Sequence, residues 1–75
     1  MSDIDKEYQT KAKRMLKAEM AREGISFDDL AEKLASIGVE DSAKNLSNKI
    51  NRGSFTAGFL LQCLEVLGCA ALRLD

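Results

Sequence analysis

The placement of glycine is the feature of this sequence that most constrains its fold. Four glycines divide the chain at nearly regular intervals, and proline is absent: Gly24, Gly38, Gly53 and Gly68. Between them, apolar residues recur at three- and four-residue steps, which is the period of an amphipathic α-helix. A glycine directly after such a segment is typical of a helix C-terminus. The pattern therefore predicts an all-α fold, a small four-helix bundle.

The first two predicted helices lie on either side of Gly24. The first covers about residues 5–22, and its apolar positions recur on one side: Tyr8, Ala12, Met15, Leu16 and Met20. The second follows Ser26, whose hydroxyl has the spacing to Asp29 that predicts a capping box. Its apolar stripe runs from Leu30 to Ile37, and Gly38 closes it.

The third predicted helix starts at Asp41 or Ser42 as N-cap and runs to about Arg52. On a helical wheel one side is apolar: Ala43, Leu46 and Ile50. The fourth helix, residues 56–68, is apolar over more than half of its circumference. An arc of that width requires burial on two sides or against another subunit. Residues 70–74 alternate weakly, which permits a short extended segment.

A chain of 75 residues has room for a single domain, with a core expected at about residues 8–69. Histidine is absent, which excludes imidazole acid–base catalysis, Ser-His-Asp or Cys-His sites and Cys/His zinc sites. Cys63 and Cys69 match neither redox nor metal spacing and are predicted to be reduced core residues. We therefore expect no enzyme activity, cofactor, metal or small-molecule substrate.

The N-terminal residues are charged and lack the apolar stretch of a signal peptide. The longest apolar segment, residues 59–74, is too short to span a bilayer comfortably and is interrupted by polar residues: Gln62, Glu65 and Arg73. We therefore expect a cytoplasmic protein without membrane contact.

The net charge of −1 conceals a separation of charge along the chain. Residues 25–41 hold five acids and a single base, Lys33, whereas residues 42–64 hold three bases and no acid. A local basic window in a near-neutral chain is compatible with nucleic-acid binding, because the field at the contact matters more than the total charge.

The outward side of the third helix carries bases and amides without a carboxylate. Asparagine pairs with adenine through two hydrogen bonds, and arginine and lysine suit guanine or phosphate. Groups one turn apart reach a groove together. We therefore expect these residues to contact double-stranded DNA: Ser42, Lys44, Asn45, Asn48, Lys49 and Arg52.

Four stretches together resemble the lambda-repressor-like, Cro-type helix-turn-helix family: residues 24–26, 30–34, 50–53 and 60–68. They also resemble a short bacterial domain family of unassigned function with the same landmarks. The resemblance covers about residues 10–69. It implies a sequence-specific DNA-binding transcriptional regulator, usually dimeric, whose recognition helix corresponds to Ser42–Arg52. The stretch from Leu34 to Leu46 is longer than the usual turn, so a lengthened turn is expected.

A second interpretation remains open, in which the same scaffold binds a protein rather than DNA. Acids stand at the starts of the second and third helices, where family members approach phosphates: Asp28, Asp29, Glu40 and Asp41. The apolar arc of the fourth helix, on its Leu61/Val66 side, then meets a partner. Either interpretation is compatible with a homodimer formed through the fourth helix and the C-terminal tail.

Overall fold

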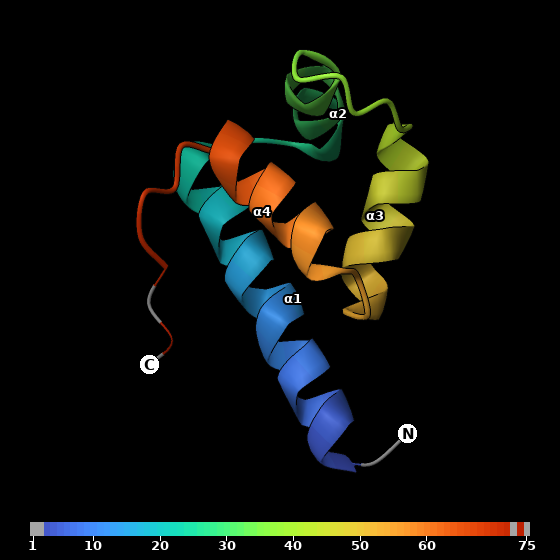
Figure 1. The fold of residues 1–75 in the computed structure, drawn as a ribbon, viewed down its shortest axis with the longest axis vertical. Helices are drawn as coiled ribbons and strands as arrows, with labels where there is room; N and C mark the ends of the chain where they lie inside the picture. The colour runs from blue at the N-terminus through green and yellow to red at the C-terminus, as the bar shows by residue number, and fades with distance from the viewer. Residues whose placement is uncertain (1–2, 73, 75) are drawn as a thin grey trace.

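The computed structural model describes residues 3–72 and 74, and four helices contain most of them (Figure 1). Their bounds are α1 (Asp3–Glu23), α2 (Phe27–Ala35), α3 (Ala43–Arg52) and α4 (Ala57–Val66). The described residues contain no strand, including those that follow α4. The predicted all-α four-helix fold is therefore confirmed. The permitted C-terminal strand does not form in residues 69–72, and Arg73 lies outside the described residues.

Hydroxyl side chains begin three of the helices at the predicted positions. The Ser26 Oγ accepts a hydrogen bond from the Asp29 N–H, and the Ser26 N–H donates to the Asp29 carboxylate, both at 3.1 Å. This is the predicted capping box. Ser42 and Thr56 cap α3 and α4 by accepting from the N–H three residues on, again at 3.1 Å. Each cap satisfies a backbone donor that the helix leaves unpaired.

Helix α2 is shorter than its apolar stripe. It ends at Ala35, and the turn after it closes at Gly38, where the following Val39 N–H donates to the Leu34 carbonyl at 2.9 Å. Ile37 falls within this turn and is 43% exposed, and Ala35 is exposed as well, so the prediction that these two residues continue the buried stripe is wrong. Residues 36–42 connect α2 to α3, which agrees with the expected lengthened connection.

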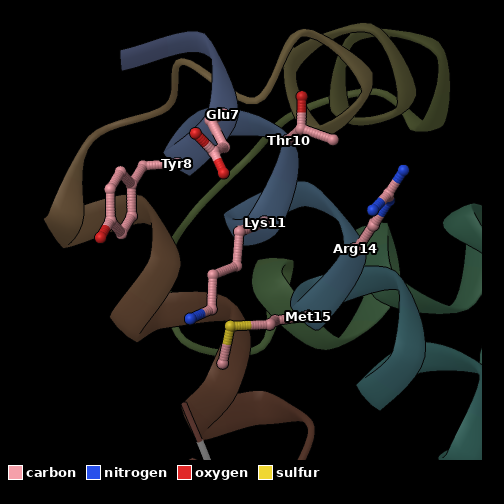
Figure 2. Close-up of a pocket in the computed structure, with 6 residues that line it drawn as sticks. All are labelled: Glu7, Tyr8, Thr10, Lys11, Arg14 and Met15. Atoms are coloured by element: carbon pink, nitrogen blue, oxygen red, sulfur yellow. The ribbon is translucent and has the colours of Figure 1, made fainter. Parts of the chain in front are cut away.

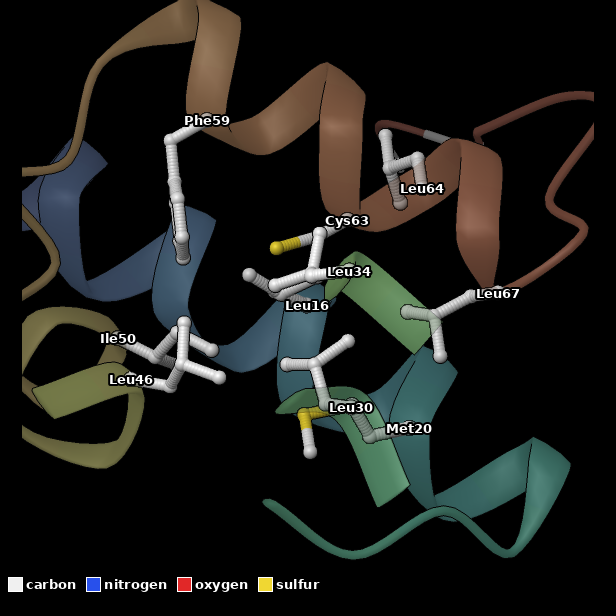
Figure 3. Packing of buried hydrophobic residues seen from close by; sticks show 10 residues of the cluster. All are labelled: Leu16, Met20, Leu30, Leu34, Leu46, Ile50, Phe59, Cys63, Leu64 and Leu67. Atoms are coloured by element: carbon white, nitrogen blue, oxygen red, sulfur yellow. The ribbon is translucent and has the colours of Figure 1, made fainter. Parts of the chain in front are cut away.

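The core lies where α1 and α2 each pack against both α3 and α4 (Figures 1 and 3). Every helix contributes to it, and Leu67 adds to it just after α4: Leu16, Met20, Leu30, Leu34, Leu46, Ile50, Phe59, Cys63, Leu64 and Leu67. Cys63 is fully buried, as predicted. Helix α4 is buried on the sides that face α1 and α2, while Leu61 on its outer side is 65% exposed.

The end of α3 lies directly against the backbone of α1. Gly53, the C-cap of α3, is buried and has a φ of 73°, a conformation that residues with a Cβ rarely adopt. A Cβ at this position would lie 2.5 Å from the carbonyl oxygen of Gln9. Glycine is therefore required here for two reasons, and it fixes how closely α3 approaches α1.

Helix α1 is the longest helix, and its N-terminal end projects beyond the rest of the domain (Figure 1). Leu16 and Met20 in its C-terminal half are buried as predicted, but Tyr8 is 63% exposed and Ile4 is 60% exposed. The expected apolar stripe of α1 is thus covered at one end only. Figure 2 shows Glu7, Tyr8, Lys11 and Met15 following one another along the open part of this helix.

Candidate nucleic-acid interface

Helix α3 is held in place by its apolar side. Leu46 and Ile50 are both fully buried in the core, at the positions that the helical wheel assigned to the inner side. The Ser42 cap fixes the start of the helix, and Gly53 fixes its end against α1. A helix held at both ends and along one side presents its opposite side in a defined orientation.

The opposite side of α3 is polar and open to solvent. Four of the six residues expected to contact DNA are exposed there: Lys44, Asn45, Asn48 and Arg52. The helix contains no Asp or Glu, so no carboxylate of its own neutralises these cations. The structure thus brings these four residues together on one surface.

Asn51 belongs to the same surface and was missed by the sequence prediction. It is exposed and borders a shallow, open hollow together with Asn48 and Arg52. Its Nδ2 donates a hydrogen bond to the Ser47 Oγ at 3.2 Å, which orients the amide. On the helical wheel Asn51 lies beside Lys44, so a slightly wider arc would have included it.

The other two expected residues have structural partners. The Ser42 Oγ accepts from the Asn45 N–H and thereby caps α3. Lys49 is half-buried, and its ammonium donates to the Asp41 Oδ2 at 3.1 Å and lies 4.7 Å from the centre of the Phe59 ring. The structure therefore does not bring Lys49 together with the open polar side of α3.

Asp41 places a negative charge at the N-terminus of α3. Its pKa is lowered chiefly by the hydrogen bond from Lys49, and next by the side chain of Asn45. The carboxylate also accepts from the Ser42 N–H at 3.0 Å. Asp41 is therefore ionised at neutral pH, and a phosphate would be repelled at this end of the helix, while the remainder of the polar side stays free of acids.

Two kinds of site are missing from the part of the chain that the structure describes. No three His, Cys, Asp or Glu side chains gather there as metal ligands would. No described helix combines the length and apolar character needed to cross a membrane.

The sequence of this domain matches a family model. The model describes DUF6471, a domain of unknown function, and it matches residues 8–72. The chain belongs to the DUF6471 family. No curated protein and no solved structure matches it. The function of this DUF6471 domain therefore has to be argued from its own residues, and α3 presents the most distinctive surface.

Proposed function

We propose that this DUF6471 domain binds duplex DNA sequence-specifically through α3, as a helix-turn-helix regulator of transcription. One observation carries the proposal: the open side of α3 holds cations and amides and no carboxylate. Solvated helix faces usually mix both signs of charge, so a surface without acids points to a negatively charged partner.

The side chains on this surface have the chemistry for reading bases. Asn48 and Asn51 can each pair with adenine, and Arg52 can pair with guanine, in the major groove. Lys44 adds a second cation to this surface, and its ammonium suits guanine as well as phosphate. Lys49 serves this surface indirectly, because its contacts with Asp41 and Phe59 hold the helix.

The arrangement of α2 and α3 supports the same proposal. The two helices pack against each other and are consecutive in the chain, as in a helix-turn-helix. The connection over residues 36–42 is longer than the family's usual turn, as the sequence predicts, so the support comes from the order and packing of the two helices. In such a module the second helix of the pair enters the major groove.

The proposal is tested by fluorescence anisotropy with a random-sequence duplex at several salt concentrations. Wild-type protein should bind with a steep salt dependence, because log K falls by about 0.9 per decade of salt for each neutralised phosphate. Lys44→Ala/Arg52→Ala should weaken binding and flatten that slope. A matched control, Arg22→Ala/Lys33→Ala, removes the same charge from exposed positions outside α3 and should bind more tightly than the α3 double variant.

Sequence preference needs a second measurement. Selection from a random duplex pool should yield a preferred site, and Asn48→Ala should relax the preference at one base by about 1–3 kcal/mol. Binding by a folded protein that the α3 variants leave unchanged would reject this surface as the interface.

One observation favours a different function, that of a protein-interaction module on the same scaffold. Carboxylates stand at the starts of both α2 and α3, and hydrogen bonds lower the pKa of Asp29 and Asp41, so both are charged at neutral pH. Phosphates disfavour such neighbours. A folded protein that fails to bind duplex at low salt would select this alternative. The side of α4 that this alternative assigns to a partner, at Leu61 and Val66, is only partly open. Leu61 is exposed, whereas Val66 packs against the core.

A further inference from the structure

The most apolar open surface of the domain is a groove along the N-terminal half of α1. Tyr8, Ala12 and Met15 line it from α1 together with Lys11, and Leu60 of α4 lines it with Leu72 and Leu74 of the C-terminal segment. Tyr8 and Leu74 are 63% and 67% exposed, so the groove lies open to solvent. We call the six apolar and aromatic residues of this lining the α1 groove.

The projecting end of α1 continues this apolar surface. Ile4 lies one helical turn before Tyr8 on the same side of the helix and is 60% exposed. Contiguous exposed apolar surface on a small domain marks an interaction site. A helical end that projects from its domain gains little stability by itself, because helix formation in water depends on packing of the apolar face. The α1 groove and Ile4 therefore require an occupant.

Charges beside the groove identify that occupant as a second copy. Glu7 and Lys11 lie on either side of Tyr8 along the same exposed side of α1 (Figure 2). Neither forms an ion pair within the described residues. In two α1 helices that pack antiparallel about a twofold axis near Tyr8, Glu7 of each copy is nearest Lys11 of the other.

We propose that the domain forms a homodimer through antiparallel packing of its α1 helices, with Ile4 of each copy seated at the Met15 end of the other copy's α1 groove. Such an interface is isologous, so each residue contact occurs twice. This moves the centre of the expected dimer from α4 to α1, while Leu60 and the C-terminal leucines remain at its border. No residue of α3 belongs to the α1 groove, so the proposal stands independently of DNA binding.

Charge reversal tests both the dimer and its geometry. Sedimentation equilibrium of wild-type protein should show a monomer–dimer equilibrium. Glu7→Lys and Lys11→Glu, each alone, should raise the dimer Kd at least about tenfold, because twofold symmetry replaces two attractions with two repulsions. A mixture of the two variants should dimerise as tightly as wild type, because in the mixed dimer both opposed pairs are again of opposite charge.

The mixture separates contacts between chains from effects within a chain. Each variant also places two like charges one turn apart within its own α1. This repulsion within the chain persists in the mixture, so recovery of dimerisation on mixing reports contacts between chains. Circular dichroism should show that both variants keep the helical content of wild type. Tyr8→Ser should weaken the dimer, whereas Ile37→Ser, which removes an exposed apolar side chain away from the groove, should not.

Three results would overturn the proposal. The first is wild-type protein that stays monomeric up to the highest soluble concentration. The second is a Tyr8→Ser variant that dimerises with the same Kd as the Ile37→Ser control. The third is a mixture of the two charge variants that dissociates as readily as either variant alone.

Discussion

The Lys49 ammonium is bound to the Asp41 carboxylate at 3.1 Å, a contact between the last turn of α3 and the residue before its N-cap. The same ammonium lies over the ring of Phe59 in α4, 4.7 Å from its centre. Lys49 of α3 thus contacts both the connection that precedes its helix and the helix that follows, α4. It holds the polar side of α3 in position without belonging to it.

Asp41→Asn should lower stability at neutral pH and remove part of its pH dependence. The pKa of Asp41 is lowered in the folded protein, so its ionised form stabilises the fold above the pKa of about 4 in the unfolded chain. That stability is lost as the pH falls through the folded pKa. Urea midpoints of wild type and variant should therefore differ at pH 7 and converge in acid. Glu40→Gln, at the exposed neighbouring acid, is the control. A difference in urea midpoint between wild type and Asp41→Asn that stays constant with pH would show that ionised Asp41 does not stabilise the fold.

Gly53→Ala should be far more destabilising than Gly24→Ala. Both glycines have a positive φ, so each substitution costs about 1–2 kcal/mol for the backbone conformation. At Gly24 a Cβ meets nothing within 4 Å, whereas at Gly53 it meets the Gln9 carbonyl oxygen at 2.5 Å. Separating α3 from α1 should cost about 1–3 kcal/mol more. Denaturant unfolding of the two variants measures the difference, and equal costs would show that this close approach is unimportant.

Leu46→Ala should destabilise the domain by about 2–5 kcal/mol, because Leu46 is fully buried and its removal leaves a cavity under α3. Leu61→Ala is the matched control, since the same atoms are removed from a side chain that is 65% exposed. It should cost less than about 0.5 kcal/mol. Thermal unfolding followed by circular dichroism compares the two. Similar costs at both positions would mean that α3 is not supported by the core as described.

The two thiols should differ sharply in reactivity. Burial raises the pKa of Cys63 to about 11, so almost no thiolate exists there at pH 8, and the side chain is inaccessible. Cys69 is half-exposed, and its pKa is raised to a lesser degree, again first by burial. A thiol reagent should therefore modify one cysteine promptly and the second only on unfolding. Cys69→Ser should abolish the prompt reaction; a prompt reaction that persists would place Cys63 at the surface.

Local chemistry explains why much of the fold could be predicted from the sequence. Ser26, Ser42 and Thr56 start helices by bonding to groups three residues away, and such caps can be recognised without knowledge of the rest of the chain. The inner side of α3 follows from helical period alone, which is why Leu46 and Ile50 were assigned correctly.

Features that depend on distant segments could not be predicted in the same way. Tyr8 is exposed because the helices that cover α1 are shorter than α1 itself. The apolar pattern of α1 does not show where that cover ends. The contacts of the Lys49 ammonium are with Asp41, which lies outside α3, and with the ring of Phe59, which lies in α4. Among the candidate site residues, helical period grouped the exposed ones correctly and places Lys49 about 60° from Leu46, outside that group. Including Lys49 among the DNA contacts rested on its charge alone.

The pairing of the helices has a consequence for how this chain folds. Close backbone approaches join α1 to α3, α1 to α4, α2 to α3 and α2 to α4, whereas α1 with α2 and α3 with α4 make none. The helices of the N-terminal pair and of the C-terminal pair therefore meet through side chains alone, without a close backbone approach, and a fragment of either pair should remain unfolded. The domain should form as a single cooperative unit, with slow amide exchange in the core-facing part of all four helices governed by one global opening.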